Sequence, residues 1–381
     1  MQIPFNIPYL TGKEEKYIND VLQKRKLSGD GYYTKKVTSL LKSKFSLNTI
    51  LMTTSCTHAL EMAVDLIDLK EGEEVIMPSF TFPSTANAVV TRGGRPIFAE
   101  IKKDTMNINP EDIERKVTEK TRAIIPVHYA GISCEMDEIK NIAERYRLYI
   151  IEDAAQGVNA RYREQYLGGL GDFACFSFHD SKNYLCGEGG ALVINSSSEN
   201  IKKRAEIIRE KGTNRSSFLR GEVSKYTWVD KGSSYLPSDL LMAVLYAQLK
   251  EMDQIKKMRK KIYEKYRKRL KEFLIYNFID NISYVPENRE SNYHTFYIKF
   301  TEGKVRNRVM DILKRRGITT TFHYIPLHSS PMGKNLGYRA EDLKITNEVG
   351  NTILRLPLYP DLTDKEQEYI IENIADVFKG L

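Results

Sequence analysis

The chain has 381 residues, more than one small hydrophobic core organises, so we expect at least two domains. Hydrophobic residues make up 41% of the chain and charged residues 28%, which is typical of a globular protein, and no window of about 18 apolar residues predicts a transmembrane helix. The net charge is +8, and the four cysteines form no Cys-x-x-Cys pair, which argues against a metal site or a disulfide scaffold and favours a reducing, cytoplasmic location.

Much of the positive charge lies in residues 250–273, KEMDQIKKMRKKIYEKYRKRLKEF. Acidic residues are interspersed with the basic ones, and apolar residues recur at helical spacing, which is typical of a solvated amphipathic helix. The competing interpretation is a regulatory protein that binds nucleic acid through this helix, but no recognition motif accompanies it. We therefore expect neither nucleic acid nor a membrane as a partner, and the modest positive charge suits a phosphorylated small substrate.

In chain order, the first two thirds of the sequence alternate short apolar runs with helical patterns. Runs rich in β-branched or aromatic residues predict strands at 50–54, 74–79, 95–101, 122–128, 148–153, 173–178 and 190–195. Helices are predicted between them at 57–68, 82–93, 109–117 and 136–147. Nearly continuous apolar strands that alternate with helices predict an α/β fold with a mostly parallel sheet covered on both faces.

The pattern changes after residue 237. The elements predicted there are a long helical region at 238–275, a strand at 293–300 and helices at 305–317 and 364–379. Such a set is typical of a smaller α+β domain. We therefore place a large domain at residues 1–250 and a small C-terminal domain at 251–381, with residues 1–30 predicted to pack on the small domain.

Chemically useful side chains follow several of these strands, and in an open parallel sheet the ligand lies beyond the carboxyl ends of the strands. Cys56 and Thr57 begin a helix after the first strand, Asp153 ends the fifth, and Lys182 follows the sixth. Each alone has an ordinary structural role, as a helix cap or as surface charge. Together they supply a helix N-terminus for a phosphate, a carboxylate for a protonated ring nitrogen and an amine for an imine. This combination predicts a site for pyridoxal 5′-phosphate.

Stretches spread over nearly the whole chain resemble the DegT/DnrJ/StrS family of nucleotide-sugar aminotransferases. They are SGDGYYT (28–34), TTSCTHALEMA (53–63), MPSFTFPSTANAV (77–89), PVHYAG (126–131), EDAAQG (152–157), SFHDSKNYLCGEGGA (177–191) and FHYIPLH (322–328). The resemblance implies the aspartate-aminotransferase-like fold (pyridoxal phosphate fold type I), with a large domain built on a mostly parallel seven-stranded sheet. It also implies pyridoxal phosphate as the cofactor.

The resemblance assigns roles to individual residues. Lys182 matches the catalytic lysine that forms a Schiff base with the cofactor, a position where related sugar dehydratases carry histidine. Asp153 matches the residue on the pyridine nitrogen, and Gln156 matches the one near the ring hydroxyl. Phe82 stands where the family places an aromatic side chain over the ring.

The phosphate positions of the family match Cys56, Thr57 and Ser177, with Cys56 in place of a common glycine. Many members also carry a Gly-x-Asn-x-Arg motif whose asparagine reaches the cofactor phosphate of the other subunit. Here Ser234 takes the place of that asparagine and Leu236 the place of the arginine. The resemblance therefore implies a homodimer with active sites at its interface, in which Ser234 either keeps or loses the contact between subunits.

Four further stretches, at 79–94, 104–108, 209–216 and 225–239, look closest to the dTDP-4-amino-4,6-dideoxygalactose transaminases. This subgroup implies L-glutamate as the amino donor and dTDP-4-keto-6-deoxy-D-glucose as the acceptor. A sister enzyme that acts at C3, or at C4 with the opposite stereochemistry, is the alternative. The substrate contacts predicted by the resemblance are His179, Lys211, Asn214, Arg215, His323 and His328, with packing roles as the alternative for the histidines.

Overall fold

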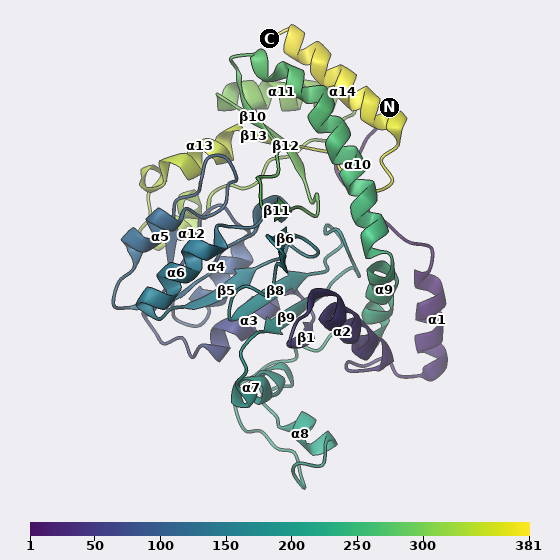
Figure 1. Cartoon of the computed structure of the whole chain (residues 1–381), viewed down its shortest axis with the longest axis vertical. Helices are drawn as coiled ribbons and strands as arrows, with labels where there is room; N and C mark the ends of the chain where they lie inside the picture. The colour runs from purple at the N-terminus through teal and green to yellow at the C-terminus, as the bar shows by residue number, and fades with distance from the viewer.

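The computed structural model describes residues 1–381, and its largest element is a seven-stranded sheet (Figure 1). The strand order is β1-β9-β8-β5-β4-β2-β3. The strands are β1 (Thr49–Thr53), β2 (Glu74–Pro78), β3 (Arg95–Ala99), β4 (Thr121–Ile124), β5 (Tyr149–Asp153), β8 (Phe173–Ser177) and β9 (Gly190–Ile194). The predicted strands are therefore all present. The fourth ends earlier than predicted, ahead of Pro126, which has no N–H to donate to a ladder.

Strand β9 runs antiparallel to both β1 and β8, and all other neighbours in the sheet are parallel. The predicted α/β fold with a mostly parallel sheet is thus confirmed. Because β8 and β9 are antiparallel, no crossover helix is needed between them. The residues that join them, 178–189, form a loop at the carboxyl end of β8, and this loop carries Lys182.

Helices cover both faces of the sheet, as the continuous apolar strands predict. On one face lie α3 (Cys56–Leu66), α4 (Pro83–Val90) and α7 (Glu199–Arg209), and on the other α2 (Tyr32–Phe45), α5 (Pro110–Lys116), α6 (Met136–Tyr146) and α9 (Asp239–Lys250). Successive residues of one strand enter different cores: Leu51 packs with α3, while Ile50 and Met52 pack with α2 and α9.

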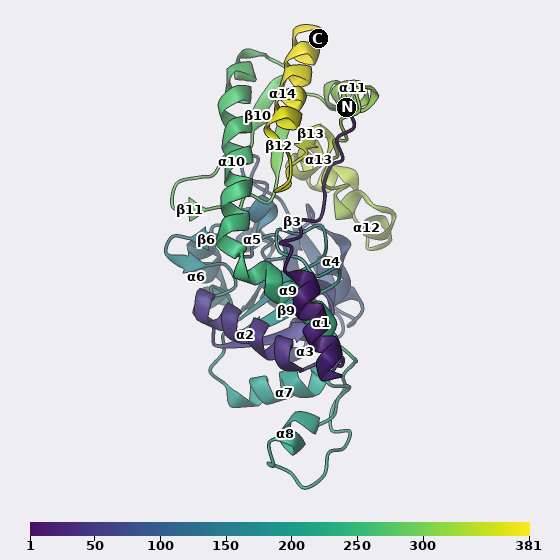
Figure 2. The ribbon, with the colours of Figure 1, turned by 90° about the vertical axis from the view of Figure 1, so that its right-hand side faces the viewer.

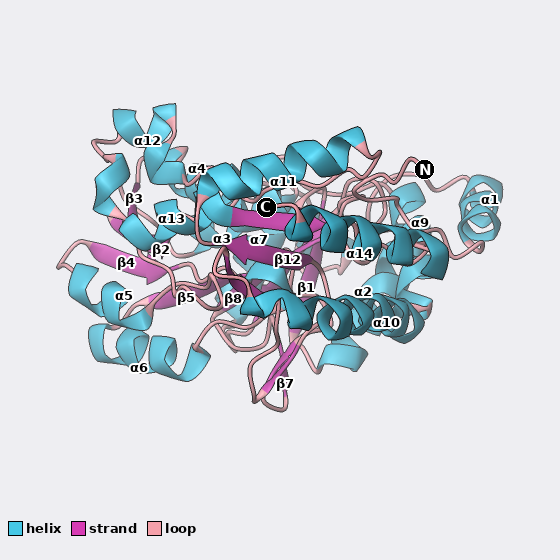
Figure 3. Ribbon diagram, turned by 90° about the horizontal axis from the view of Figure 1, so that it is seen from above, coloured by secondary structure: helices cyan, strands magenta, loops and turns pink.

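A second sheet lies at the other end of the molecule and has three antiparallel strands in the order β10-β12-β13. The strands are β10 (Ile279–Ile282), β12 (Phe296–Phe300) and β13 (Ile353–Leu356), and the helices packed with them are α10 (Met252–Leu270), α11 (Gly303–Arg315) and α14 (Asp364–Lys379) (Figures 1 and 3). Ile3 belongs to the same buried cluster, whereas α1 (Glu14–Lys24) and α2 contact α9. The domain boundary at residues 250 and 251 stays a prediction.

Helix α10 shows how the basic stretch is used. The predicted long helical region breaks at Glu251, which separates α9 from α10. The apolar face of α10 is buried, and its outward cations pair with acids of α14, Lys261 with Asp364 at 2.9 Å and Lys265 with Glu368 at 3.3 Å. These pairs favour the amphipathic interpretation over a surface that binds polyanions.

The remaining elements are short. They are α8 (Arg215–Leu219), α12 (Pro331–Asn335), α13 (Lys344–Thr352) and a small antiparallel sheet of β6 (Arg161–Tyr162), β7 (Gln165–Tyr166) and β11 (Arg289–Glu290). Figures 1 and 2 show α8 in a loop that extends away from the rest of the molecule, at the end opposite the three-stranded sheet. None of the helices combines the length and the apolar character that a membrane span requires.

Candidate active site

A cavity of about 610 Å³ lies at the carboxyl ends of β5 and β8 and is closed by residues of the small sheet. Of the predicted site residues, those that line it are Cys56, Thr57, Phe82, Asp153, Gln156, Ser177, His179, Lys182 and His323. They come from five separate stretches of the chain, so the topology of the sheet is what brings them together.

Lys182 lies in the loop between β8 and β9, and its backbone N–H donates to the carbonyl of His179 at 2.9 Å. Its side chain enters the cavity, and no carboxylate forms an ion pair with it. Burial lowers the pKa of Lys182 below the ordinary lysine value, although the nearby Cys56 and Asp153 oppose the shift. The amine is therefore easier to deprotonate than a surface lysine, which suits a nucleophile and a proton carrier.

Asp153 ends β5 and is 5% exposed. Its Oδ2 accepts a hydrogen bond from the Oγ1 of Thr85 at 2.8 Å, and its Oδ1 accepts from the backbone N–H of Ala155 at 3.2 Å. Burial raises the pKa of Asp153, while these hydrogen bonds and Lys182 oppose the rise. These hydrogen bonds fix the orientation of the carboxylate, which forms no ion pair within the chain. A carboxylate in this state can bind the cationic ring nitrogen of a ligand.

The first turn of α3 forms another part of the wall. The Oγ of Ser55 caps the helix by accepting from the N–H of His58 at 3.1 Å, so Ser55 is the cap, while Cys56 and Thr57 supply N–H groups of the first turn. Gly190 packs directly on this turn, because a Cβ at that position would lie 2.4 Å from the backbone nitrogen of Cys56. This close approach explains the glycine at the start of β9.

Gln156 and Phe82 lie at the sides of the cavity. The Oε1 of Gln156 accepts from the N–H of Ala130 at 2.8 Å, and its Nε2 donates to the hydroxyl of Tyr324 at 2.8 Å. Phe82 is 61% exposed, directly before α4, although it lines the cavity. Such a large exposed ring at a cavity is available to cover a planar ligand.

Two of the predicted substrate residues also line the cavity. The Nδ1 of His179 lies 2.8 Å from the Oγ of Ser181, and its ring is partly exposed. The Nε2 of His323 contacts the Nη1 of Arg355. Burial lowers the pKa of His323 well below the usual histidine range, so its ring is neutral.

The other predicted residues lie outside this cavity. His328 is fully buried, and its Nδ1 lies 2.6 Å from the Oγ of Ser79. Arg215 begins α8, where its Nη1 donates to Glu210 at 2.8 Å, and the Oδ1 of Asn214 accepts from the N–H of Thr227 at 2.7 Å. These three residues already have partners within the chain, so their substrate roles stay predictions.

Lys211 and Ser234 belong to the same peripheral segment as α8. The N–H of Lys211 donates to the carbonyl of Ser233 at 2.9 Å, and Ser234 forms an isolated bridge with Glu210. Neither residue lines the cavity of its own chain. For Ser234, which was predicted to reach the cofactor of another subunit, this position leaves the prediction open.

Several residues of the cavity wall were not predicted. Those with polar or aromatic side chains include Phe5, Thr85, Arg259, His294, Thr295, Tyr324 and Arg355. One sequence signal was available for Arg355, which is the lone charge in the apolar run ILRLPL (353–358). Phe5 and His294 carry no local signal, because only the packing of distant segments brings them here.

Behind the cavity, Glu152 anchors the end of β5. It contacts His128 Nε2 at 3.0 Å and accepts backbone N–H bonds from Gly168, Leu170 and Gly171 at 2.7 to 2.9 Å. The Nδ1 of His128 accepts from the N–H of Cys134, so the ring proton lies on Nε2 and points at Glu152. Although burial alone raises the pKa of Glu152, these hydrogen bonds hold it below the usual value.

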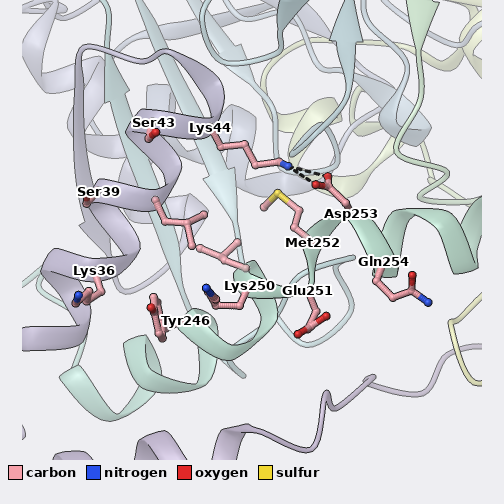
Figure 4. Close-up of a pocket in the computed structure, with 12 residues that line it drawn as sticks. Lys36, Ser39, Ser43, Lys44, Tyr246, Lys250, Glu251, Met252, Asp253 and Gln254 are labelled. Atoms are coloured by element: carbon pink, nitrogen blue, oxygen red, sulfur yellow. Dashed lines mark hydrogen bonds and ion pairs between the residues drawn. The ribbon is translucent and has the colours of Figure 1, made fainter.

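A second hollow lies between α2 and the junction of α9 with α10 (Figure 4). It contains none of the predicted site residues. Three of its charged side chains form ion pairs, Lys44 with Asp253 at 2.7 Å and Glu251 with Lys13.

The comparisons with known proteins agree with this geometry. The model of the DegT/DnrJ/EryC1/StrS aminotransferase family matches residues 8–375. The chain belongs to this family. It is a sugar aminotransferase, as the resemblance predicted.

The similar proteins cover nearly the full length of the chain. The spore coat polysaccharide biosynthesis protein SpsC of Bacillus subtilis is 31% identical, with 99% of this chain and 97% of that protein aligned. The GDP-perosamine synthase of Escherichia coli O157:H7 is 28% identical, with 99% and 98% aligned. Among solved structures, the pyridoxal phosphate form of the putative sugar aminotransferase Spr1654 from Streptococcus pneumoniae has a TM-score of 0.92 and 26% identity, covering 100% of this chain and 99% of that one.

Pyridoxal phosphate is the cofactor of this family, and the cavity fits it. The first turn of α3 offers N–H groups to a phosphate, and Gly190 leaves the space in front of Cys56 free of a Cβ. Asp153 is a buried carboxylate that can hold a protonated ring nitrogen, and Lys182 is a buried amine without a counter-ion.

Proposed function

We propose that this enzyme transfers the amino group of L-glutamate to a nucleotide-linked 4-keto-6-deoxy sugar. The expected reaction converts dTDP-4-keto-6-deoxy-D-glucose to dTDP-4-amino-4,6-dideoxy-D-galactose. One observation carries the proposal. A lysine whose pKa is lowered by burial and a carboxylate without a cation line the same cavity as the first turn of a helix.

Each wall of the cavity has its own task. The N–H groups at Cys56 and Thr57 would bind the cofactor phosphate, and Asp153 would hold the proton on the ring nitrogen. Pyridoxal phosphate, when bound, supplies a carbonyl carbon that takes up an amino group and a ring that delocalises an electron pair. The Nζ of Lys182 is readily uncharged and can take the proton from the α-carbon of the amino donor. The ring of Phe82 excludes water from the face it covers.

The nucleotide-linked substrate class is supported by two similarities. One relative is named for GDP-perosamine, a nucleotide sugar, and another for polysaccharide biosynthesis. The segments at 79–94, 104–108, 209–216 and 225–239 favour the dTDP-linked subgroup, which they resemble. Because the face of the sugar presented to Lys182 depends on its pose, a sister reaction at C3 or with the opposite C4 stereochemistry is the alternative.

We also propose a homodimer whose subunits share their active sites, located in the cytoplasm. Large apolar side chains are exposed on the loop around α8, including Trp228 at 77% and Leu219 at 64%, which a partner subunit would cover. Ser234 lies in the same segment and is the residue predicted to reach the partner's cofactor. All four cysteines are free and buried, which supports a reducing compartment.

The test is to incubate the enzyme with L-glutamate and dTDP-4-keto-6-deoxy-D-glucose and to identify the amino sugar by NMR. The proposal predicts an amine at C4 with the galacto configuration. The GDP-linked keto sugar is the comparison substrate and is expected to react more slowly. A gluco product would favour the sister reaction at C4, and an amine formed only from the isomeric 3-keto sugar would favour the sister reaction at C3. Amination of the GDP sugar alone would overturn the choice of nucleotide.

A further inference from the structure

His294 presents an imidazole ring to the active-site cavity from the loop that precedes β12. The residue is 7% exposed and lines the cavity. Its ring is neutral, because burial lowers the pKa of His294 well below the usual range. The groups around it that act in the same direction are Lys182, Arg259, Arg355 and His323. A neutral imidazole has one nitrogen that donates a hydrogen bond and one that accepts.

Asn183 decides which nitrogen of His294 is the acceptor. The Nδ2 of Asn183 donates to the backbone carbonyl of Asn292 at 2.8 Å, so its Oδ1 is the atom that lies 2.9 Å from the Nδ1 of His294. An amide oxygen can only accept, so the ring proton is on Nδ1 and the lone pair is on Nε2. Unlike the fully buried polar atoms that lack a partner, this Nε2 is open to the cavity, and it forms no hydrogen bond within the chain.

Lys182 is the complementary group, a donor without an acceptor. Its side chain is buried in the same cavity, and its Nζ forms neither a hydrogen bond nor an ion pair within the chain. Lys182 and Asn183 are consecutive, so the residue that orients the ring of His294 is the neighbour of the residue that carries the amine. Both Lys182 and His294 also line a small chamber that adjoins the cavity. The amine and the ring therefore lie at the same boundary between two spaces.

The small chamber limits what else can reach Nε2 of His294. Its volume is about 10 Å³, which holds at most one water molecule. A chain of water molecules therefore cannot supply a donor from that side. The partner of Nε2 comes from the active-site cavity, and the two candidates are the Nζ of Lys182 and a hydroxyl of the sugar. Lys182 acts in both half-reactions, whereas the sugar is present in only one, so the two candidates are separable by experiment.

We propose that His294 is a positioning residue for Lys182, whose Nζ donates a hydrogen bond to the Nε2 of His294. This inference deepens the proposed aminotransferase function and rests on it. An uncharged amine has two N–H bonds and one lone pair, so a hydrogen bond to His294 leaves the lone pair of Lys182 free to take the proton from the substrate carbon. Once that proton is on Nζ, the same hydrogen bond becomes charge-assisted and stronger, while the ring of His294 itself takes no proton.

The experiment labels Lys182 with an amine reagent in cofactor-free enzyme over a range of pH, and mass spectrometry measures the midpoint. In His294→Asn the amide lies where Nδ1 was, so the bond to Asn183 is kept and the acceptor at Nε2 is lost. In His294→Gln the amide reaches the place of Nε2 and restores an acceptor there. His294→Phe serves if the asparagine variant does not fold.

The matched control is Ser291→Ala. Ser291 lies in the same loop, where its Oγ accepts from the N–H of Tyr293 at 2.9 Å, and it does not line the cavity. This variant disturbs the loop without touching the ring of His294. A second measurement follows the two half-reactions separately by the absorbance of the cofactor, the first with L-glutamate and the second with the keto sugar.

We expect the midpoint of Lys182 labelling to fall by about one pH unit in His294→Asn. The hydrogen bond to a neutral acceptor favours the charged amine, so its loss makes the neutral amine available at lower pH. The other groups that shift this pKa, Cys56, Asp153 and Arg355, are unchanged in every variant. Both half-reactions should slow about 10- to 100-fold, with little change in KM.

The remaining variants should separate the hydrogen bond from a disturbance of the loop. His294→Gln should recover most of the midpoint and of the two rates, and Ser291→Ala should keep the midpoint of the wild type. An unchanged midpoint in a folded His294→Asn or His294→Phe enzyme would overturn the inference, as would an equal shift in Ser291→Ala. A loss confined to the keto-sugar half-reaction would also overturn it and would make His294 a contact of the sugar.

The labelling needs neither cofactor nor substrate, so it is independent of the proposed reaction. If the midpoint shifts as expected and the glutamate half-reaction slows, but no keto sugar is aminated by the wild type, the proposed substrate fails while the role of His294 stands.

Discussion

Two hollows of this protein, the active-site cavity and the one beside α2, have the same volume, about 610 Å³ each, and differ in how their charges are paired. In the hollow beside α2, Lys44 pairs with Asp253, whose side chain is 79% exposed, so water and a partner both stabilise the charges. In the cavity at the ends of β5 and β8, Lys182, Asp153 and Arg355 lie buried without ion-pair partners.

This comparison teaches that volume does not identify a site. The active-site cavity is distinguished by buried ionisable groups that have no ion-pair partner. Each of these groups raises the free energy of the unliganded protein. A ligand that completes these groups recovers that cost. The predictions below test the difference, beginning with the largest effect.

Lys182→Ala should lower kcat/KM by about 10⁴-fold, because the variant loses both the nucleophile and the proton carrier. The chemical check is borohydride reduction followed by peptide mapping. In the wild type the cofactor should be fixed on the peptide that contains Lys182, and in the variant on no peptide. A cofactor still fixed at another lysine of the variant would refute this assignment.

Asp153→Asn should lower kcat by about 10²- to 10³-fold, because a neutral amide does not hold the proton on the ring nitrogen. The substitution keeps the shape of the side chain, so the melting temperature should change little. Thr85→Val removes the hydrogen bond to Oδ2 of Asp153, together with the one between the hydroxyls of Thr85 and Thr81 at 2.8 Å, and should cost about 10-fold. Wild-type activity of Asp153→Asn would contradict the view that the unpaired buried charges of the active-site cavity serve catalysis.

The labelling of Lys182 by an amine reagent should have its midpoint at a lower pH than that of an ordinary lysine in cofactor-free enzyme. The reason is that burial disfavours the charged form, so the reactive neutral amine is present at lower pH. Asp153→Asn should move the midpoint lower still, since it removes a carboxylate that favours the charged amine. Mass spectrometry of the labelled peptides measures both midpoints, with the exposed Lys35 as the comparison.

Lys44→Met should have the smallest effect, because a partly exposed ion pair contributes at most about 1 kcal/mol. We expect kcat/KM within about twofold of the wild type and almost the same free energy of unfolding in urea. A large loss of activity in this variant would show that the second hollow has a function of its own. Paired charges would then not be evidence that a hollow lacks a function.

The large sheet was predictable because its signals are local. Each strand is a short apolar run that ends in turn residues, and β9 even begins at the predicted Gly190. The short strands β6, β7 and β11 were not predicted, since two residues carry no periodicity. The break between α9 and α10 at Glu251 was missed too, because the helical pattern of the sequence continues across it.

The cavity was predictable where its residues follow strands of the large sheet, as Asp153 and Lys182 do. Arg355 and His294 come from the small sheet, and their place in the wall depends on how that sheet packs over the large one. A local sequence pattern carries no information about how the two sheets pack against each other. His328 illustrates the reverse case, since its motif suggested a substrate contact, while its partner Ser79 is 249 residues away in the chain.

The doublet Glu152-Asp153 has a consequence for the register of β5. Neighbouring residues of a strand point to opposite sides, so Asp153 faces the cavity while Glu152 is tied to His128 and to the turn at 168–171. A slip of one residue that brought Glu152 to the cavity would put Ile151 in the place of Glu152 and leave four hydrogen-bond donors without an acceptor. Glu152 therefore fixes the register of β5. Exchanging the two acids, so that residues 152–157 read DEAAQG, should abolish the site although the composition of the chain stays the same.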